Sequence, residues 1–194
     1  MIIYYKLMRS KDLDKQQRIK AAMVRLILRE GIDGASVSKI AKEAEVSPAT
    51  IYVYYESKEA MLSEVFREYS RRSYSYLMKR IYPGMRGGEL IETLVRGYFA
   101  FSVEHREIFS FVEQCSRCPT LAESVCEEEC CCDIFDLIHT FQERGEMKKY
   151  GDMNVGAVLF APVKFIAMNS TLSVNEVNEQ LDELVVMLKS MLLN

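Results

Sequence analysis

Residues 31–58 decide the fold, and they have the sequence GIDGASVSKIAKEAEVSPATIYVYYESK. Apolar residues stand at positions 37, 40, 41 and 44, which is the i, i+3, i+4, i+7 spacing of one apolar helix face. The pattern stops after Ala44. Ser47-Pro48 then predicts the start of a second helix, because Ser suits a helix N-cap and Pro suits the first helical position. The stretch therefore predicts two short helices joined by a tight turn, the second over about Pro48 to Tyr54.

The second of these helices carries side chains that suit contact with DNA. We expect it to bury Ile51 and to present Thr50, Tyr52 and Tyr54 on its other sides. In a helix-turn-helix the second helix enters the major groove, with its N-terminal residues toward the bases. Hydroxyl groups and small side chains can contact base edges or phosphates there without bulk, so the segment predicts a DNA-binding unit.

The same run resembles the N-terminal domain of the TetR family of bacterial transcriptional regulators. That family has a long first helix ending in Gly, then Thr/Ser-V-x-x-I-A, then A-G-V-S-x-x-T-hydrophobic-Y-x-[YH]-F, and a Lys that opens the fourth helix. Two positions depart from the pattern: Glu45 stands at the usual turn Gly, which is favoured there because it permits φ > 0, and Ala49 stands at the common Gly of the recognition helix. The residues that carry the resemblance are Gly31, Ser36-Val37, Ile40-Ala41, Ala44-Glu45-Val46-Ser47, Thr50-Ile51-Tyr52, Tyr54-Tyr55 and Lys58.

The resemblance implies DNA-binding roles for particular positions. Tyr52 and Lys58 are expected at phosphates, contacts that fix position but carry no sequence information directly. Ala49, Thr50 and Tyr54 are expected at base edges, and Ala49 is small enough to meet a thymine methyl. Because Pro48 and Val53 are apolar where other members often offer polar groups, we expect few direct base hydrogen bonds and some specificity from DNA shape. The full candidate set is Ser36, Ser47, Ala49, Thr50, Tyr52, Tyr54 and Lys58, with Tyr55 expected in the core.

The charge distribution supports this interpretation although the whole chain has a net charge of −3. Residues 1–58 carry 11 Lys and Arg against 7 Asp and Glu, a net of +4, and the remainder carries 14 against 21, a net of −7. Phosphate contacts supply much of the affinity for DNA, so the local excess matters more than the total. Taken alone, a net charge of +4 would be explained equally well by a solvated helix face. Because the excess coincides with the motif, it supports DNA binding.

The rest of the chain predicts an all-α protein of about nine helices. Pro83-Gly84 and Gly87-Gly88 interrupt the pattern and mark a hinge. We therefore expect a helix-turn-helix domain over 1–58, continuing into a connecting helix over 58–82, and a helical effector-binding and dimerisation domain over 83–194. Outside the motif the expected helices span about 12–30 (capped by Gly31), 58–81, 89–104, 106–115, 120–144 with a capping box at Thr120 and Glu123, one from 152, and one from 173 with a capping box at Ser173 and Glu176.

The last two helices are strongly amphipathic and need a partner surface. The final stripe consists of Val177, Leu181, Leu184, Val185, Leu188 and Leu192. In the resembled family the last two helices pack against their copies, which implies a homodimer through helices near 152–170 and 173–193. The alternative is that they close the core of a monomer. A dimer would let two recognition helices reach major grooves a whole number of turns apart on a palindromic operator.

Helices five to eight enclose an effector pocket in the resembled family, so the resemblance implies a small-molecule effector. Aromatic residues commonly line such pockets, although an aromatic stripe at helical spacing is more often core. Nothing in the sequence identifies the chemistry of the effector. The candidate pocket residues are Tyr98, Phe101, Phe109, Phe135 and Phe160.

All six cysteines lie between Cys115 and Cys132, which leaves open a metal- or redox-responsive regulator. Thiolates bind zinc or copper(I), and thiols of low pKa sense oxidants. Against this, three consecutive cysteines point in different directions on a helix, and Glu127 to Glu129 would raise neighbouring thiol pKa values. The possible sensor thiols are Cys115, Cys118, Cys126 and Cys130.

The leading hypothesis is a cytoplasmic, effector-responsive repressor that binds double-stranded DNA without a cofactor. A thiol oxidoreductase built on Cys115-x-x-Cys118 is an alternative, but that motif is expected beside a βαβ pattern, which we do not find. A helical adaptor without DNA binding is a third class, because Glu45 would place negative charge near phosphates. We expect no membrane span, since no stretch approaches about 20 consecutive apolar residues, and no signal peptide, since no small-residue cleavage site follows the short apolar start.

Overall fold

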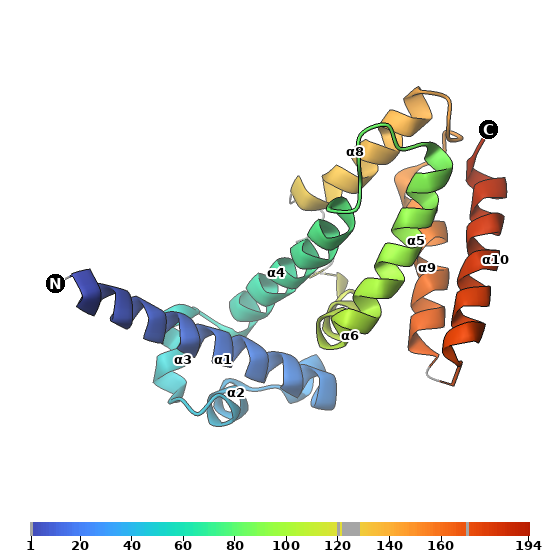
Figure 1. Ribbon diagram of the computed structural model, residues 1–194. Coiled ribbons are helices and arrows are strands. Elements are labelled where there is room, and N and C mark those ends of the chain that lie inside the picture. Colours follow the sequence, from blue (N-terminus) through green and yellow to red (C-terminus); the bar gives the residue numbers. More distant parts are fainter. Residues whose placement is uncertain (1, 120, 122–128, 170) are drawn as a thin grey trace. The chain divides into compact units, whose positions relative to one another are not determined.

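The computed structural model describes residues 2–119, 121, 129–169 and 171–194, with the backbone alone for 2–11 and 129–133. The described chain is all-α, as predicted, and its one pairing of extended backbone is an isolated bridge between Met147 and Leu193. The helices, shown in Figure 1, are α1 (Ile2–Gly34), α2 (Val37–Glu43), α3 (Pro48–Tyr54), α4 (Lys58–Met78), α5 (Gly87–Glu104), α6 (Arg106–Cys115), α8 (Glu129–Glu143), α9 (Asp152–Met168) and α10 (Val174–Leu192).

The predicted helix bounds hold except at a few ends. α1 begins at Ile2, so the predicted start near residue 12 was wrong; neither Gly nor Pro interrupts the chain between these positions. The predicted end of this helix at Gly31 is marked by a φ of 81° there, which breaks the helical geometry before a short last turn to Gly34. α8 is described only from Glu129, and the predicted capping box at Thr120 and Glu123 lies outside the described residues.

Contacts divide the chain into two compact units, one of residues 1–70 with 107–125 and one of 71–106 with 126–194. This division falls within α4 and places most of α6 in the first unit. The predicted functional boundaries, 1–58 and 83–194, stay a prediction.

The core of the first unit is built on α1. Its stripe of Ile19, Ala22, Met23, Leu26 and Ile27 is at most 1% exposed. α6 joins this core, since the side-chain amide of Gln114 donates to the Ile27 carbonyl at 3.0 Å and the Phe111 ring packs edge-on against Tyr69 of α4.

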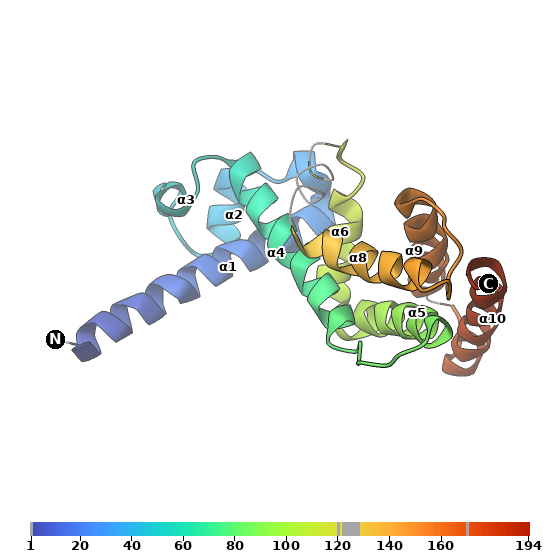
Figure 2. The ribbon, with the colours of Figure 1, turned by 90° about the horizontal axis from the view of Figure 1, so that it is seen from above.

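The second unit contains a cluster of three long helices that all pack against one another. α5 packs against both α9 and α10, which also pack against each other (Figures 1 and 2). The predicted C-terminal stripe is confirmed from Leu181 onward, since its members there are at most 8% exposed, whereas Val177, its first predicted member, is only half-buried. None of the described helices is long and apolar enough to cross a membrane.

Candidate nucleic-acid interface

The turn between α2 and α3 is a complete Schellman motif. The backbone N–H of Val46 donates to the Ala41 carbonyl at 2.9 Å, and that of Glu45 donates to Lys42 at 3.3 Å. These two bonds satisfy carbonyls that the end of α2 leaves without helical partners. The motif needs a left-handed residue, and Glu45 takes this place with a φ of 56°. The substitution at the family's turn glycine thus leaves the turn geometry intact.

Serine side chains fix the starts of both helices, as the sequence predicted for Ser47. The Oγ of Ser36 accepts from the Lys39 N–H at 3.4 Å, and the Oγ of Ser47 accepts from the Thr50 N–H at 3.2 Å, ahead of Pro48 in the first helical position. Arg18 of α1 adds a bond from its Nη1 to the Ala44 carbonyl at 3.2 Å. The orientation of α3 is therefore set by hydrogen bonds at its N-terminal end.

α3 divides into a buried and an exposed side. Ile51 is 1% exposed and Tyr55, at its C-cap, is 4% exposed, so the predicted core positions are confirmed. Tyr52 is 57% exposed and Val53 is 78% exposed. The exposed side of α3, defined here as Pro48, Ala49, Tyr52 and Val53, is available for contact with a groove.

Four polar candidates, Ser47, Thr50, Tyr54 and Lys58, already have partners within the first unit. The hydroxyls of Thr50 and Ser47 are hydrogen-bonded to each other at 2.9 Å. The Tyr54 hydroxyl donates to Asp12 at 2.9 Å, and burial together with this bond raises the pKa of the phenol. The Nζ of Lys58, at the start of α4, donates to the Ile32 carbonyl at 3.3 Å.

Much of the positive charge in this unit pairs with acidic groups. Arg25 and Arg29 of α1 both bind Glu43 of α2, at 2.9 and 3.0 Å, and these hydrogen bonds lower the pKa of the Glu43 carboxyl. Lys39 binds Glu30 at 2.7 Å, and Lys20 lies between Glu64 and Glu68 of α4. These cations hold the helices of the unit together.

Lys42 is a candidate that the sequence analysis missed. It is exposed in the last turn of α2, next to the turn that leads to α3, and among the described residues its ammonium has no ion-pair partner. The signal available in the sequence was its position beside the turn. Its neighbour Glu43 could have been taken as its ion-pair partner, but in the fold Glu43 binds Arg25 and Arg29 instead.

Residues 19–65, which hold the helix-turn-helix, match the family model described as bacterial regulatory proteins, tetR family. This N-terminal domain belongs to the TetR family. An uncharacterized HTH-type transcriptional regulator of Haemophilus influenzae is 37% identical over 71 residues, 37% of this chain and 36% of that protein. The fatty acid metabolism regulator protein of Bacillus subtilis is 43% identical over 54 residues, 28% of each chain. The chain thus spans about a third of the length of these curated relatives.

Solved TetR-family structures share the whole described fold. A TetR family transcription regulator from Marinobacter aquaeolei VT8 superposes with a TM-score of 0.77 at 22% identity, over 92% of this chain and 97% of that one. The transcriptional regulator FadR from Bacillus subtilis, solved in complex with stearoyl-CoA, gives 0.72 at 22% identity, over 90% and 97%. The helices beyond the TetR-family domain therefore follow the same fold.

None of the five predicted pocket residues lines the open groove that the second unit has beside α5. Tyr98 and Phe160 pack edge-on with ring centroids 5.0 Å apart, and Phe101 packs against Tyr76 and His105. Phe135 lies near Gly156, and Phe109 belongs to the first unit, where it is buried. Their role as effector contacts stays a prediction.

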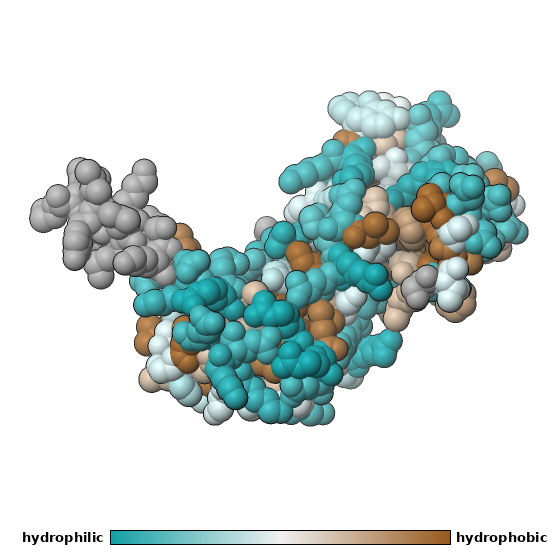
Figure 3. Space-filling model, turned by 60° about the horizontal axis from the view of Figure 1, so that its bottom comes forward, coloured by the Kyte–Doolittle hydropathy of each residue, from teal (hydrophilic) through white to brown (hydrophobic). Residues whose placement is uncertain are grey.

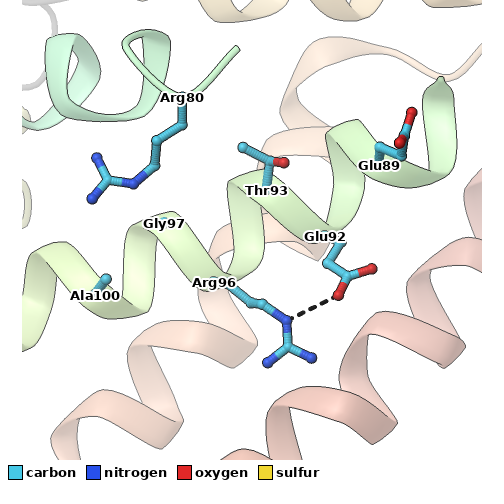
Figure 4. A pocket seen from close by; sticks show the side chains of 7 residues that line it. All are labelled: Arg80, Glu89, Glu92, Thr93, Arg96, Gly97 and Ala100. Carbon is cyan, nitrogen blue, oxygen red and sulfur yellow. Dashed lines mark hydrogen bonds and ion pairs between the residues drawn. The ribbon is translucent and has the colours of Figure 1, made fainter. Parts of the chain in front are cut away.

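The cavity described in the second unit is an open groove of about 580 Å³ beside α5 (Figure 4). Its charged groups already have partners in the protein: Arg96 binds Glu92, and the Arg80 guanidinium covers the Tyr76 ring at 3.6 Å. The groove is lined by Arg80, Glu89, Glu92, Thr93, Arg96, Gly97 and Ala100, none of which was predicted.

Of the four candidate sensor thiols, the structure describes the side chains of Cys115 and Cys118. Burial raises the pKa of the Cys115 thiol to about 12, so this group is almost entirely protonated at neutral pH and a poor nucleophile. Cys126 lies outside the described residues, and Cys130 is described in its backbone alone. Among the described residues no cluster of three or more His, Cys, Asp or Glu side chains has a metal-binding arrangement.

Proposed function

We propose that this chain is a dimeric, effector-responsive transcriptional repressor that binds a palindromic DNA operator in the cytoplasm. The observation that carries the proposal is the helix-turn-helix, in which the turn and caps hold α3 with one side buried and one side free. Tyr52 and Lys58 act at phosphates, and Ala49, Thr50 and Tyr54 face the bases. Ser36 and Ser47 hold the ends of α2 and α3 against the DNA backbone.

The C-terminal helices supply the dimer interface. α9 is not the strongly amphipathic helix that the sequence predicted: Val155, Leu159 and Val163 are buried, but Phe165 is 74% and Met168 62% exposed, so apolar residues also lie outside its buried face. Exposed apolar side chains on more than one face of a helix need cover beyond the core of the unit. α10 adds Val186, Met187 and Met191, which are all exposed.

The same surface suits a two-fold interface, in which one patch meets its own copy. Hydrophobic patches interrupt the hydrophilic surface of the molecule in Figure 3. On this proposal the outward sides of α9 and α10, near 152–170 and 173–193, are buried in the homodimer. Pairing two α3 helices would then fix the spacing of the two operator half-sites.

The second unit is the effector domain in this proposal. Its aromatic pair, Tyr98 and Phe160, joins α5 to α9, so a ligand that separates these rings would move a helix of the dimer interface. An effector releases the operator only if it binds the DNA-incompetent state more tightly than the competent one. Stearoyl-CoA is bound by the solved FadR, and a repressor named nicotine-responsive is 33% identical over 61 residues, so these two compounds are the first probes.

The experiment that tests the proposal is selection of bound sequences from a random DNA pool, followed by affinity measurements on the enriched site. We expect an inverted repeat bound by a dimer, with affinity that falls as salt rises. Lys58→Ala should weaken binding to every sequence and reduce the salt slope by roughly one, whereas Thr50→Ala should relax discrimination at one operator position. Enrichment of no sequence under any condition would contradict the proposal and favour the helical adaptor.

Dimerisation is tested separately with Phe165→Glu. This variant should sediment as a monomer and lose binding to the inverted repeat, since a buried unpaired carboxylate is costly. The matched control is Val103→Glu, which introduces the same charge on α5 at a residue that is 62% exposed. If both variants remain dimeric, the interface lies elsewhere.

A further inference from the structure

The exposed side of α3 offers methyl groups where recognition helices commonly offer amides or guanidinium groups. Ala49 and Val53 lie one helical turn apart, so their side chains share a face. Val53 is 78% exposed and Ala49 is also exposed, which leaves both available to a groove.

α3 has few polar groups that could form hydrogen bonds with bases near Ala49 and Val53. α3 contains no Arg, Lys, Asn or Gln, the residue types that form bidentate hydrogen bonds with guanine or adenine. The Thr50 hydroxyl is bonded to Ser47, and the Tyr54 hydroxyl is bonded to Asp12. The edge of α3 that carries Ala49 and Val53 therefore offers a base only apolar contact from these two side chains.

The major groove has one apolar feature, the C5 methyl group of thymine. We propose that Ala49 and Val53 recognise a thymine methyl in each operator half-site, with Val53 as the principal determinant of specificity. This inference rests on the proposed function, because it places α3 in the major groove. 5-Methylcytosine carries the same methyl at the same ring position, so it should satisfy the contact where cytosine does not.

The expected effect follows from the burial of one methyl group. Removing it should lower affinity about fourfold for one half-site and about 15-fold for both half-sites of a dimeric operator. A contact based on a hydrogen bond would not respond in this way, since replacing thymine by uracil leaves every donor and acceptor of the base unchanged.

The test uses the full-length protein and the operator enriched by selection. Each thymidine is replaced in turn by deoxyuridine. The position that responds is also replaced by deoxycytidine and by 5-methyldeoxycytidine, of which the methylated base should bind more tightly. Affinity is measured for the parent and for Val53→Ala. We expect one thymine position in each half-site where uracil costs about fourfold for the parent, and where Val53→Ala binds thymine and uracil equally. Val103→Ala, which shortens another exposed valine on α5, should keep the full discrimination of the parent.

The outcomes separate this inference from the proposed function. If the operator is bound but no deoxyuridine position lowers affinity, the methyl contact is wrong and the regulator remains. If uracil lowers affinity equally for the parent and Val53→Ala, the methyl is read by another residue and the assignment to Val53 is wrong. If no operator is enriched, the proposed function fails and this inference fails with it. Because Val53 is exposed, thermal melting of Val53→Ala should match that of the parent.

Discussion

Replacing Glu45 by Gly should stabilise the protein, although Glu45 lies in the turn on which the DNA-binding unit depends. Glu45 occupies the left-handed region with a φ of 56°, where the Cβ of an L-residue crowds the backbone. Its side chain is exposed, and among the described residues its carboxylate has neither a hydrogen-bond nor an ion-pair partner. Glu45→Gly therefore removes strain without removing a contact.

The magnitude follows from two opposing terms. Left-handed backbone costs an ordinary residue about 1–2 kcal/mol, and Gly is free of this cost. Gly makes the unfolded chain more flexible, which offsets about 0.4–1 kcal/mol. The net gain is about 0.5–1 kcal/mol, or roughly 2–3 °C in melting temperature for a protein of this size.

The assay is urea unfolding followed by circular dichroism, with Glu45→Ala and Glu45→Gln as controls. Both controls remove the carboxylate and keep the Cβ, so neither should gain the stability of Glu45→Gly. The Gln variant also separates charge from strain, because it should bind DNA more tightly than the parent, as Glu45→Gly should. The reasoning is refuted if Glu45→Gly is no more stable than Glu45→Ala at an unchanged urea dependence.

Three further predictions follow from the structure. Lys42→Ala should weaken binding to all DNA sequences and reduce the salt slope by about one, whereas Lys149→Ala, at an exposed lysine of the second unit, should not; equal slopes for both would exclude Lys42 from the interface. The pKa of Glu43 is lowered from 4.5 in the folded state, so its contribution to stability is present above pH 4.5 and is lost as pH falls through the lower folded value. Glu43→Gln should accordingly melt earlier than the parent at pH 7, with the two melting temperatures converging on acidification, and parallel curves would contradict this. Because the pKa of Cys115 is raised to about 12, iodoacetamide at pH 7.5 should modify the partly exposed Cys118 before Cys115 in the native protein, as read by peptide mass spectrometry.

The helices whose bounds were predicted well are those whose ends are set by neighbouring residues in the sequence. The bounds of α3 and α6 agree with prediction to the residue, because a Ser-Pro start and a short apolar pattern are local signals. The start of α1 was misplaced because Ser10 suits an N-cap just before the predicted start, whereas the absence of Gly and Pro from residues 2–11 let the helix extend to Ile2. Amphipathic spacing identified the buried stripes of α1 and α10, since a single face packs against the core.

The candidate interface was predictable in its position but not in its chemistry. The motif placed α3 and its caps, whereas the hydrogen bond between Tyr54 and Asp12 joins residues 42 positions apart in sequence. The net charge of +4 over residues 1–58 likewise could not show which cations are paired. Arg25, Arg29 and Glu43 meet only when α2 packs on α1, so the fold determines how much of that charge faces DNA.

The ion pairs of Arg25 and Arg29 with Glu43 affect how much of the DNA affinity comes from phosphate contacts and how much from base contacts. If Arg25 and Arg29 stay bound to Glu43 on DNA, each protomer brings few free charges, of which Lys42 is one, and the salt slope of the dimer should be shallow. Sequence discrimination would then rest on apolar contacts of α3, which salt does not screen, and should persist at ionic strengths that abolish non-specific binding. A steep slope would mean that the ion pairs open on DNA and release arginines to phosphates. In that case Glu43→Gln, which frees both arginines in advance, would bind non-specific DNA more tightly than the parent.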